Sequence, residues 1–162
     1  MSDLASTFVW HPLRRFFMST PKRTFLIYPV LIIVFEFAVY GQLTFAWWGI
    51  PLLVWGYLQY KLTGRYRHGI AKGSSGMDLM PEHIVDHGPY RFTRNPMYLG
   101  HLIFMTGLIV TFESWLAVAI LVVNIIWFHR RVLSDEARLT AAFGDEYTAY
   151  KARVKRWIPG VI

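Results

Sequence analysis

The sequence contains no cysteine and few acidic residues, and both absences exclude classes of protein. Without cysteine the chain has no disulfide framework, no thiolate metal ligand and no thiol nucleophile. Asp and Glu together number 10 against 17 Lys and Arg, so the formal net charge is +7. Charged residues of either sign are also nearly absent from two long stretches, which excludes a disordered charged tail as a description of the whole chain.

Apolar residues are abundant instead. Hydrophobic residues make up 54% of the 162 residues, aromatic residues make up 17%, and the mean hydropathy is +0.32. Soluble domains average about 45–50% apolar residues even when glycine is counted, and glycine is not counted here. The composition therefore predicts a single membrane domain over residues 1–162. A membrane also accounts for the positive charge, so we expect no nucleic-acid partner.

Two blocks of the sequence are nearly free of charge, and each is long enough for two short membrane spans. The first block, residues 24–60, contains only Glu36, and the second, residues 97–128, contains only Glu113. As helices they would be about 55 and 48 Å long, whereas a bilayer core is about 30 Å thick. We therefore expect an all-α polytopic membrane protein whose four transmembrane helices form two hairpins. The expected spans are about 25–40, 47–62, 97–112 and 115–133.

The basic residues support this topology. Every Lys and Arg lies in the N-terminal arm, the central segment or the tail, and neither hairpin turn contains one. The positive-inside rule then places both termini and the centre in the cytoplasm. We expect an integral, multi-pass protein of a bacterial inner membrane or an ER-type membrane. The arm at residues 4–18 is either an interfacial segment or unstructured, and the sequence does not decide between them.

Proline and glycine mark the ends of helices on the cytoplasmic side. Pro96 suits the first turn of the third span, because its missing N–H would be unpaired there in any case. The helix N-terminus, with Arg91 and Arg94, favours an anion at the membrane surface. Downstream, residues 134–162 predict a cytoplasmic helical tail in which Gly144 ends one helix. In the same tail the i,i+4 pair Arg131 and Asp135 is either functional or a solvated ion pair.

A motif with a known counterpart runs through these segments. Gly88-Pro89-Tyr90 is followed by Arg94-Asn95-Pro96-Met97-Tyr98-Leu99-Gly100, then by a hydrophobic hairpin and by Asp135-Glu136. This pattern resembles the signature of the isoprenylcysteine carboxyl methyltransferase and phospholipid methyltransferase superfamily. The resemblance covers roughly residues 76–159, about half of the chain. The acidic pair and the tail make it more specific than the arginine-proline-tyrosine-glycine core alone.

The resemblance implies a methyltransferase that uses S-adenosylmethionine, and since the histidines show no metal-ligand spacing we expect no metal. The cofactor would lie in a cytosolic pocket at the membrane surface, and the tail would complete this pocket. The resemblance also implies that Arg131 positions the acceptor, and the chemistry of methyl transfer adds Glu136 as a second catalytic candidate. The residues implied for cofactor binding are Val85, Tyr90, Arg94, Asn95, Pro96, Met97, Tyr98, Leu99, Asp135 and Glu136.

Two residues depart from the family pattern. Asn95 stands where the family has histidine, and asparagine cannot titrate near neutral pH. A role as proton acceptor is therefore doubtful at Asn95, while a role in holding the cofactor is not. Asp135 replaces glutamate and shortens the reach of that side chain by one methylene.

The acceptor is expected to be a lipid or lipidated small molecule, of the isoprenylcysteine or phospholipid type. A carboxylate acceptor needs only a cation such as Arg131, whereas an amine needs a base such as Glu136 or Glu36. The sequence leaves O-, N- and S-methylation open, as well as the oligomeric state. Two alternatives also stay open: a membrane reductase related to the sterol reductases that uses NADPH, and a non-catalytic membrane scaffold with the same fold.

Two polar residues inside the expected spans are further candidates. Glu36 is an intramembrane carboxylate, which is a functional candidate by default or else a paired structural group. His101 follows Tyr98 by three residues, so the two side chains share a helix face. His101 therefore either contributes to the pocket or hydrogen-bonds across helices.

Overall fold

The computed structural model describes residues 19–71 and 83–157, and these residues form helices and turns with no strand among them. The all-α prediction is confirmed for this part of the chain. The expected interfacial arm at 4–18 and both termini lie outside the described residues, so their cytoplasmic position stays a prediction. The elements are α2 Thr20–Lys22, the π-helical turn η1 Arg23–Ile27, α3 Tyr28–Tyr40, the 3-10 turn η2 Trp47–Gly49, α4 Ile50–Ala71, the 3-10 turn η3 Gly88–Arg91, α5 Pro96–Phe112 and α6 Trp115–Arg153.

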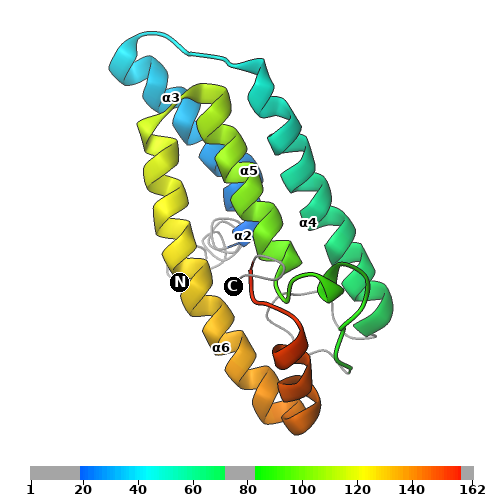
Figure 1. The fold of residues 1–162 in the computed structure, drawn as a ribbon. Helices are drawn as coiled ribbons and strands as arrows, with labels where there is room; N and C mark the ends of the chain where they lie inside the picture. Colours follow the sequence, from blue (N-terminus) through cyan, green and yellow to red (C-terminus); the bar gives the residue numbers. More distant parts are fainter. Residues whose placement is uncertain (1–18, 72–82, 158–162) are drawn as a thin grey trace, which may run out of the picture.

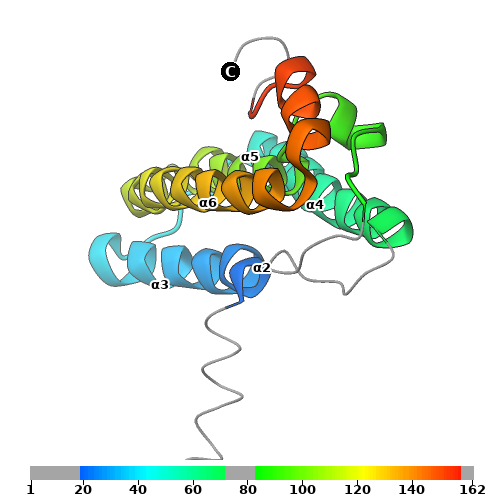
Figure 2. The same cartoon turned by 90° about the horizontal axis from the view of Figure 1, so that it is seen from below.

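The long helices form two layers. Helices α4, α5 and α6 lie side by side with α5 between the other two, and α2 and α3 cover one face of this layer (Figures 1 and 2). The polar segment before α5 and the end of α6 gather at one end of the bundle, on the side away from α3 (Figure 2). The bundle therefore places residues from both halves of the predicted motif at a single end.

Glycines bring α4 and α5 into backbone contact. A Cβ atom added at Gly56 would lie 2.4 Å from the backbone nitrogen of Phe104, and one added at Gly100 would lie 2.8 Å from that of Tyr60. Small residues at such positions let helix backbones approach closely, which is the usual way helices pack in lipid. Gly100 of the motif therefore fixes the distance between α5 and α4.

Both predicted hairpin turns lie at the end of the bundle opposite the polar segment. The backbone nitrogen of Ala46 donates to the carbonyl oxygen of Thr111 at 2.7 Å, which joins the first turn to the end of α5. Helix α3 ends at Tyr40 and is capped by Gly41, whose φ of 67° is left-handed, and α5 ends at Phe112 and is capped by Glu113, with a φ of 50°. The Ser114 hydroxyl then accepts a hydrogen bond from the Ala117 backbone and caps α6.

Three helix boundaries differ from the sequence-based expectation. The first helix begins at Thr20 rather than near 25, and the second covers Ile50–Ala71 instead of 47–62. Helix α6 continues to Arg153, so the expected tail starts as an extension of the fourth span. The reason is that a charged side chain ends a membrane span without ending a helix, because it can point into water. The break occurs where glycine was predicted to stop the helix, at Gly144, with φ 54° and ψ −123°.

The helices have the character of a membrane protein. Two helical stretches of the described residues are long and apolar enough to cross a bilayer, Thr20–Tyr40 and Trp115–Arg153, and Pro96–Phe112 is apolar but shorter. Large apolar side chains face outward along the bundle, for example Val30 at 59% exposure and Val123 at 64%. A soluble monomer rarely exposes contiguous apolar surface on this scale. The four-span topology stays a prediction.

Candidate functional site

A half-open cavity lies at the polar end of the bundle, where the first turn of α5 meets α4 and the second half of α6. Its empty space, counted out to the open mouth, is about 770 Å³. Two tyrosines beyond Gly144 form one wall, opposite the first turn of α5. The lining residues are Arg67, Ile84, Val85, Tyr90, Arg94, Asn95, Pro96, Met97, Tyr98, Asp135, Arg138, Leu139, Tyr147 and Tyr150.

Most of the residues predicted for cofactor binding line this one cavity. They come from the segment before α5, from its first turn and from α6, and they are Val85, Tyr90, Arg94, Asn95, Pro96, Met97, Tyr98 and Asp135. Within the described ranges, Leu99, Arg131 and Glu136 are not part of the lining. The cofactor and catalytic roles of all these residues stay predictions.

Asp135 is the acidic group of the cavity wall. Its Oδ2 accepts a hydrogen bond from the Tyr98 hydroxyl at 3.1 Å, and its Oδ1 pairs with the guanidinium of Arg138. The i,i+4 pair seen in the sequence is also present, because Arg131 Nε lies 3.6 Å from Asp135 Oδ1. The Asp135 carboxylate is thus held in place by three side chains while it still faces the cavity.

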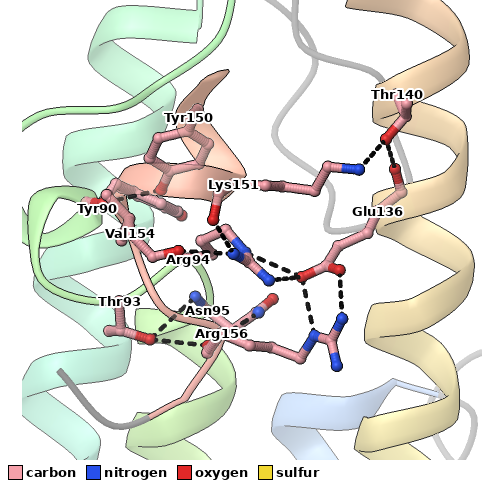
Figure 3. Close-up of polar contacts among 10 residues, drawn as sticks. All are labelled: Tyr90, Thr93, Arg94, Asn95, Glu136, Thr140, Tyr150, Lys151, Val154 and Arg156. Atoms are coloured by element: carbon pink, nitrogen blue, oxygen red, sulfur yellow. Dashed lines mark hydrogen bonds and ion pairs between the residues drawn. The ribbon is translucent and has the colours of Figure 1, made fainter. Parts of the chain in front are cut away.

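Glu136 does not line the cavity and is held by two arginines (Figure 3). Its Oε1 accepts from Arg94 Nε at 3.0 Å and from Arg156 Nε at 3.1 Å, and its Oε2 accepts from Arg156 NH2 at 2.8 Å. Arg94 NH2 adds a contact of 2.9 Å to Oε1. Three of these contacts fall on Oε1 and one on Oε2, so the two guanidinium groups engage both oxygens of the carboxylate.

Arg94 also binds the backbone at the end of α6. Its NH1 donates to the carbonyl oxygens of Lys151 at 2.9 Å and Val154 at 2.6 Å (Figure 3). The guanidinium is nearly buried, with 9% of the side chain exposed. The anion site predicted at Arg94 is therefore occupied mainly by groups of the chain itself, and at most one N–H of its five is left for a ligand.

Asn95 and its neighbour fasten the residues beyond α6. The Asn95 side-chain amide donates to the carbonyl oxygen of Arg156 at 3.2 Å, and the Thr93 hydroxyl donates to the same oxygen at 3.0 Å. The residue that replaces the family histidine thus makes a contact that needs only a hydrogen-bond donor. A titratable ring is not required for this contact.

Burial changes the chemistry of the tyrosines in the wall. Loss of water raises the pKa of Tyr90 to about 12 and that of Tyr147 to about 12. Burial also raises the pKa of Tyr150, whose hydroxyl donates to the Tyr90 carbonyl oxygen at 2.8 Å. These phenols remain neutral at physiological pH, so they offer aromatic faces and hydrogen bonds but no base.

The electrostatics of Glu136 predict a dependence of stability on acid. Burial alone would raise the pKa of its carboxyl, but hydrogen bonds and charge from Arg156 and Arg94 outweigh burial, and the net pKa is lowered. A lowered pKa in the folded state stabilises the fold above the ordinary glutamate value of about 4.3, and this stabilisation is lost as the pH falls through the lowered pKa. We expect Glu136→Gln to be less stable than the unaltered protein at pH 7 and to have a flatter pH dependence below about 4.3.

Thermal unfolding in detergent, followed by tryptophan fluorescence between pH 7 and pH 3, measures this dependence. Asp86→Asn is the control, because the pKa of Asp86 is also lowered, first by a hydrogen bond with His87, but its carboxylate lies at the surface. An exposed pair contributes little to stability. A Glu136→Gln profile parallel to that of the unaltered protein would contradict the assigned role of the carboxylate.

Several lining residues were not predicted from the sequence. They are Arg67, Ile84, Arg138, Leu139, Tyr147 and Tyr150. The spacing of Asp135, Arg138 and Leu139 puts them on one helix face, and this signal could have revealed the second and third of them. Arg67 carried no such signal, because it is one of many basic residues near the expected membrane surface.

The two intramembrane candidates lie apart from the cavity lining. Glu36 is 7% exposed, and its Oε1 has no hydrogen-bond partner among the described residues. His101 is fully buried, with its ring stacked 4.9 Å from Phe25 and 4.7 Å from Tyr60. Neither ring nitrogen of His101 finds a partner within the described part of the chain. The functional roles considered for both residues stay predictions.

The known proteins that this chain resembles all have names of methyltransferases. The profile of the family described as phospholipid methyltransferase matches residues 37–146. A protein-S-isoprenylcysteine O-methyltransferase of Schizosaccharomyces pombe is 33% identical over 81 residues, which are 47% of this chain and 33% of that protein. Methanethiol S-methyltransferase 1 of Bradyrhizobium diazoefficiens is 31% identical over 93 residues, 57% of this chain and 32% of its own length.

A third relative is protein-S-isoprenylcysteine O-methyltransferase A of Arabidopsis thaliana, 35% identical over 79 residues. Those residues are 48% of this chain and 40% of the relative. The chain therefore spans about a third to two fifths of the length of the curated relatives it matches. The names of these relatives share methyl transfer, but they give different acceptors.

Proposed function

The chain belongs to the phospholipid methyltransferase family, and from this premise we propose that it moves a methyl group from S-adenosylmethionine to a lipid-like acceptor at the membrane surface. The observation that carries the proposal is that most of the predicted cofactor residues line a single cavity. Those residues lie as far as 50 positions apart in the sequence, which is the separation of Val85 and Asp135. Their assembly is what a binding site requires.

The chemistry of the lining fits this methyl donor. The Asp135 carboxylate suits an ammonium group or the hydroxyls of a ribose. The faces of Tyr90 and Tyr147 suit a cation or a purine ring. The first turn of α5 leaves the N–H groups of Met97 and Tyr98 without an intrahelical partner, and such groups bind a carboxylate.

When bound, the donor supplies a methyl group on a cationic sulfur, and the carbon–sulfur bond breaks as the acceptor atom bonds to carbon. The residues of the chain hold and align the reactants, which is the largest contribution that such a displacement needs. Glu136 pairs with Arg94 and Arg156, which lower the pKa of its carboxyl and make it a weak base. An acceptor that arrives ionised, such as a carboxylate, therefore suits this site better than a protonated amine.

The membrane arrangement completes the proposal. Four spans in two hairpins would put the cavity at the cytoplasmic surface, where a soluble donor and an apolar acceptor can meet. Arg131, which contacts Asp135 near the end of the apolar part of α6, would attract the polar end of the acceptor. The names of the relatives do not favour the NADPH-dependent reductase, and the scaffold alternative predicts donor binding without turnover.

The decisive measurement is binding of the product analogue S-adenosylhomocysteine to the purified protein in detergent. Asp135→Asn is expected to raise the Kd at least about tenfold, because a hydrogen bond to a charged group is worth about 1.5–3 kcal/mol. Asp86→Asn, a change of the same kind at an exposed loop residue, should leave the Kd unaltered.

Turnover is tested by incubating the protein with methyl-labelled donor and a total lipid extract. Labelled lipid that depends on the protein supports the proposal, and binding without any labelled product supports the scaffold alternative. No binding of S-adenosylhomocysteine by the unaltered protein would remove the proposal.

A further inference from the structure

The residues after α6 fold back over the loop that precedes α5. Helix α6 ends at Arg153, and Val154 is extended, with φ −114° and ψ 131°. We call residues 154–157 the C-terminal strap. The backbone carbonyl oxygens of the strap accept four hydrogen bonds from the loop. Arg94 donates its backbone N–H to Lys155 at 3.0 Å and its side chain to Val154 at 2.6 Å. The side chains of Thr93 and Asn95 donate to Arg156 at 3.0 and 3.2 Å.

Glu136 closes this arrangement from the other side. The Arg156 side chain reaches it with two parallel N–H contacts, at 3.1 and 2.8 Å, and Arg94 reaches it with contacts of 3.0 and 2.9 Å (Figure 3). Bidentate pairs between arginine and carboxylate are strong and geometrically specific. We call Arg94, Glu136 and Arg156 the clasp. The clasp joins the loop before α5, the middle of α6 and the strap.

The clasp bears on the cavity through the segment between Gly144 and the strap. This segment supplies Tyr147 and Tyr150 to the wall, and the Tyr150 hydroxyl reaches the carbonyl oxygen of Tyr90. Gly144 interrupts α6 with a left-handed φ, and a Cβ added there would meet no atom within 4 Å. The tyrosine wall is thus joined to the rest of α6 at a break in the helix and is fastened at its far end by the strap.

We propose that Arg156 is a positioning residue for the methyl donor: with Glu136 and Arg94 it clasps the C-terminal strap and so holds Tyr147 and Tyr150 as a wall of the cavity. The inference rests on the proposed function. It divides the acidic pair, because Asp135 faces the ligand whereas Glu136 holds the wall. The resemblance alone had given both residues to the cofactor.

The test is the Kd for S-adenosylhomocysteine in Arg156→Gln, compared with Arg153→Gln. Arg153 is a matched control on the same segment, 66% exposed and paired only at the surface with Asp86 among the contacts described here. We expect Arg156→Gln to raise the Kd about tenfold and to leave kcat at saturating donor within about threefold. We expect Arg153→Gln to change neither.

Two further variants separate positioning from a general loss of structure. Arg156→Lys keeps the charge but not the paired contacts, and it should recover only part of the affinity. A double-mutant cycle combines Glu136→Gln with Arg156→Gln. The double variant should have about the same Kd as the single variant that binds less tightly, because both changes open the same clasp.

The possible results distinguish the two proposals. If the unaltered protein binds S-adenosylhomocysteine and Arg156→Gln has the same Kd, the inference is overturned and the proposed function stands. Additive losses in the double variant also overturn the inference. Absence of binding by the unaltered protein overturns the proposed function, and the inference falls with it.

Discussion

Replacing Gly100 by valine is expected to unfold the bundle or to lower its free energy of unfolding by about 3 kcal/mol. The Cβ alone would lie 2.8 Å from the Tyr60 backbone nitrogen and 2.9 Å from the Gly56 carbonyl oxygen. Both obstacles are backbone atoms, which cannot rotate away as a side chain can. Valine adds two methyl groups to this contact, so α5 must move away from α4.

The loss reaches the cavity as well. Gly100 follows Pro96, Met97 and Tyr98 by about one turn, and these three residues line the cavity. The contact from the Gln59 side chain to the Pro96 carbonyl oxygen, 3.1 Å long, also joins α4 to the first turn of α5. A displaced α5 therefore removes binding of S-adenosylhomocysteine together with stability.

Thermal unfolding and size-exclusion elution in detergent measure the effect, with Gly100→Ala as an intermediate step. Gly69→Ala is the control, since Gly69 also lies in a helix and a Cβ there meets no atom within 4 Å. Alanine is about 0.5–1 kcal/mol better than glycine in a helix, so Gly69→Ala should be neutral or stabilising. Equal unfolding temperatures for Gly100→Val and Gly69→Ala would show that α4 and α5 do not touch at this point.

Arg94→Gln is expected to cost about 3–5 kcal/mol of stability, the usual result of removing one partner from a buried ion pair. The change leaves Glu136 with Arg156 alone and leaves the carbonyl oxygens of Lys151 and Val154 without their donor. Glutamine is too short to reach all three groups at once. The strap and the tyrosine wall should loosen together, and the Kd for S-adenosylhomocysteine should rise by more than the change at Arg156 produces.

Arg91→Gln is the matched control for this prediction, because Arg91 is three residues away, exposed, and rests on the ring of its neighbour Phe92 at 5.9 Å. Unfolding temperature and donor-analogue affinity are measured on both variants under the same conditions. If Arg94→Gln retains the stability and affinity of Arg91→Gln, the clasp is not what holds this end of the molecule together.

Helix positions were largely predictable because they follow from local chemistry. The ends of α3 and α5 fall at Tyr40 and Phe112 as expected, and the break at Gly144 was predicted from glycine as a helix stop signal. The errors concern where a helix continues into water. The charged residues indicated where a membrane span should stop, but α4 and α6 continue beyond those points because a charged side chain does not end a helix.

The lining of the cavity was predictable only for the residues that belong to the recognised motif. Val85, Tyr90 and Asp135 were expected to share a site on resemblance, and the structure places them around one cavity. The resemblance did not separate the roles of two adjacent acidic residues. Asp135 and Glu136 point about 100° apart on a helix of 3.6 residues per turn, and in this fold Asp135 lines the cavity whereas Glu136 does not. The positions of Arg94 and Arg156 then decided what the other would bind.

Composition, periodicity and turn residues were enough to establish an apolar helical chain with a basic end and a methyltransferase-like motif, because each of these depends on residues close in sequence. The pairing of Glu136 with Arg94 and Arg156 joins residues 42 and 20 positions apart. The backbone contact between Gly56 and Gly100 joins residues 44 positions apart. Seventeen Lys and Arg residues carry the same charge in the sequence, and only the packing of the helices selects which of them is buried beside a carboxylate.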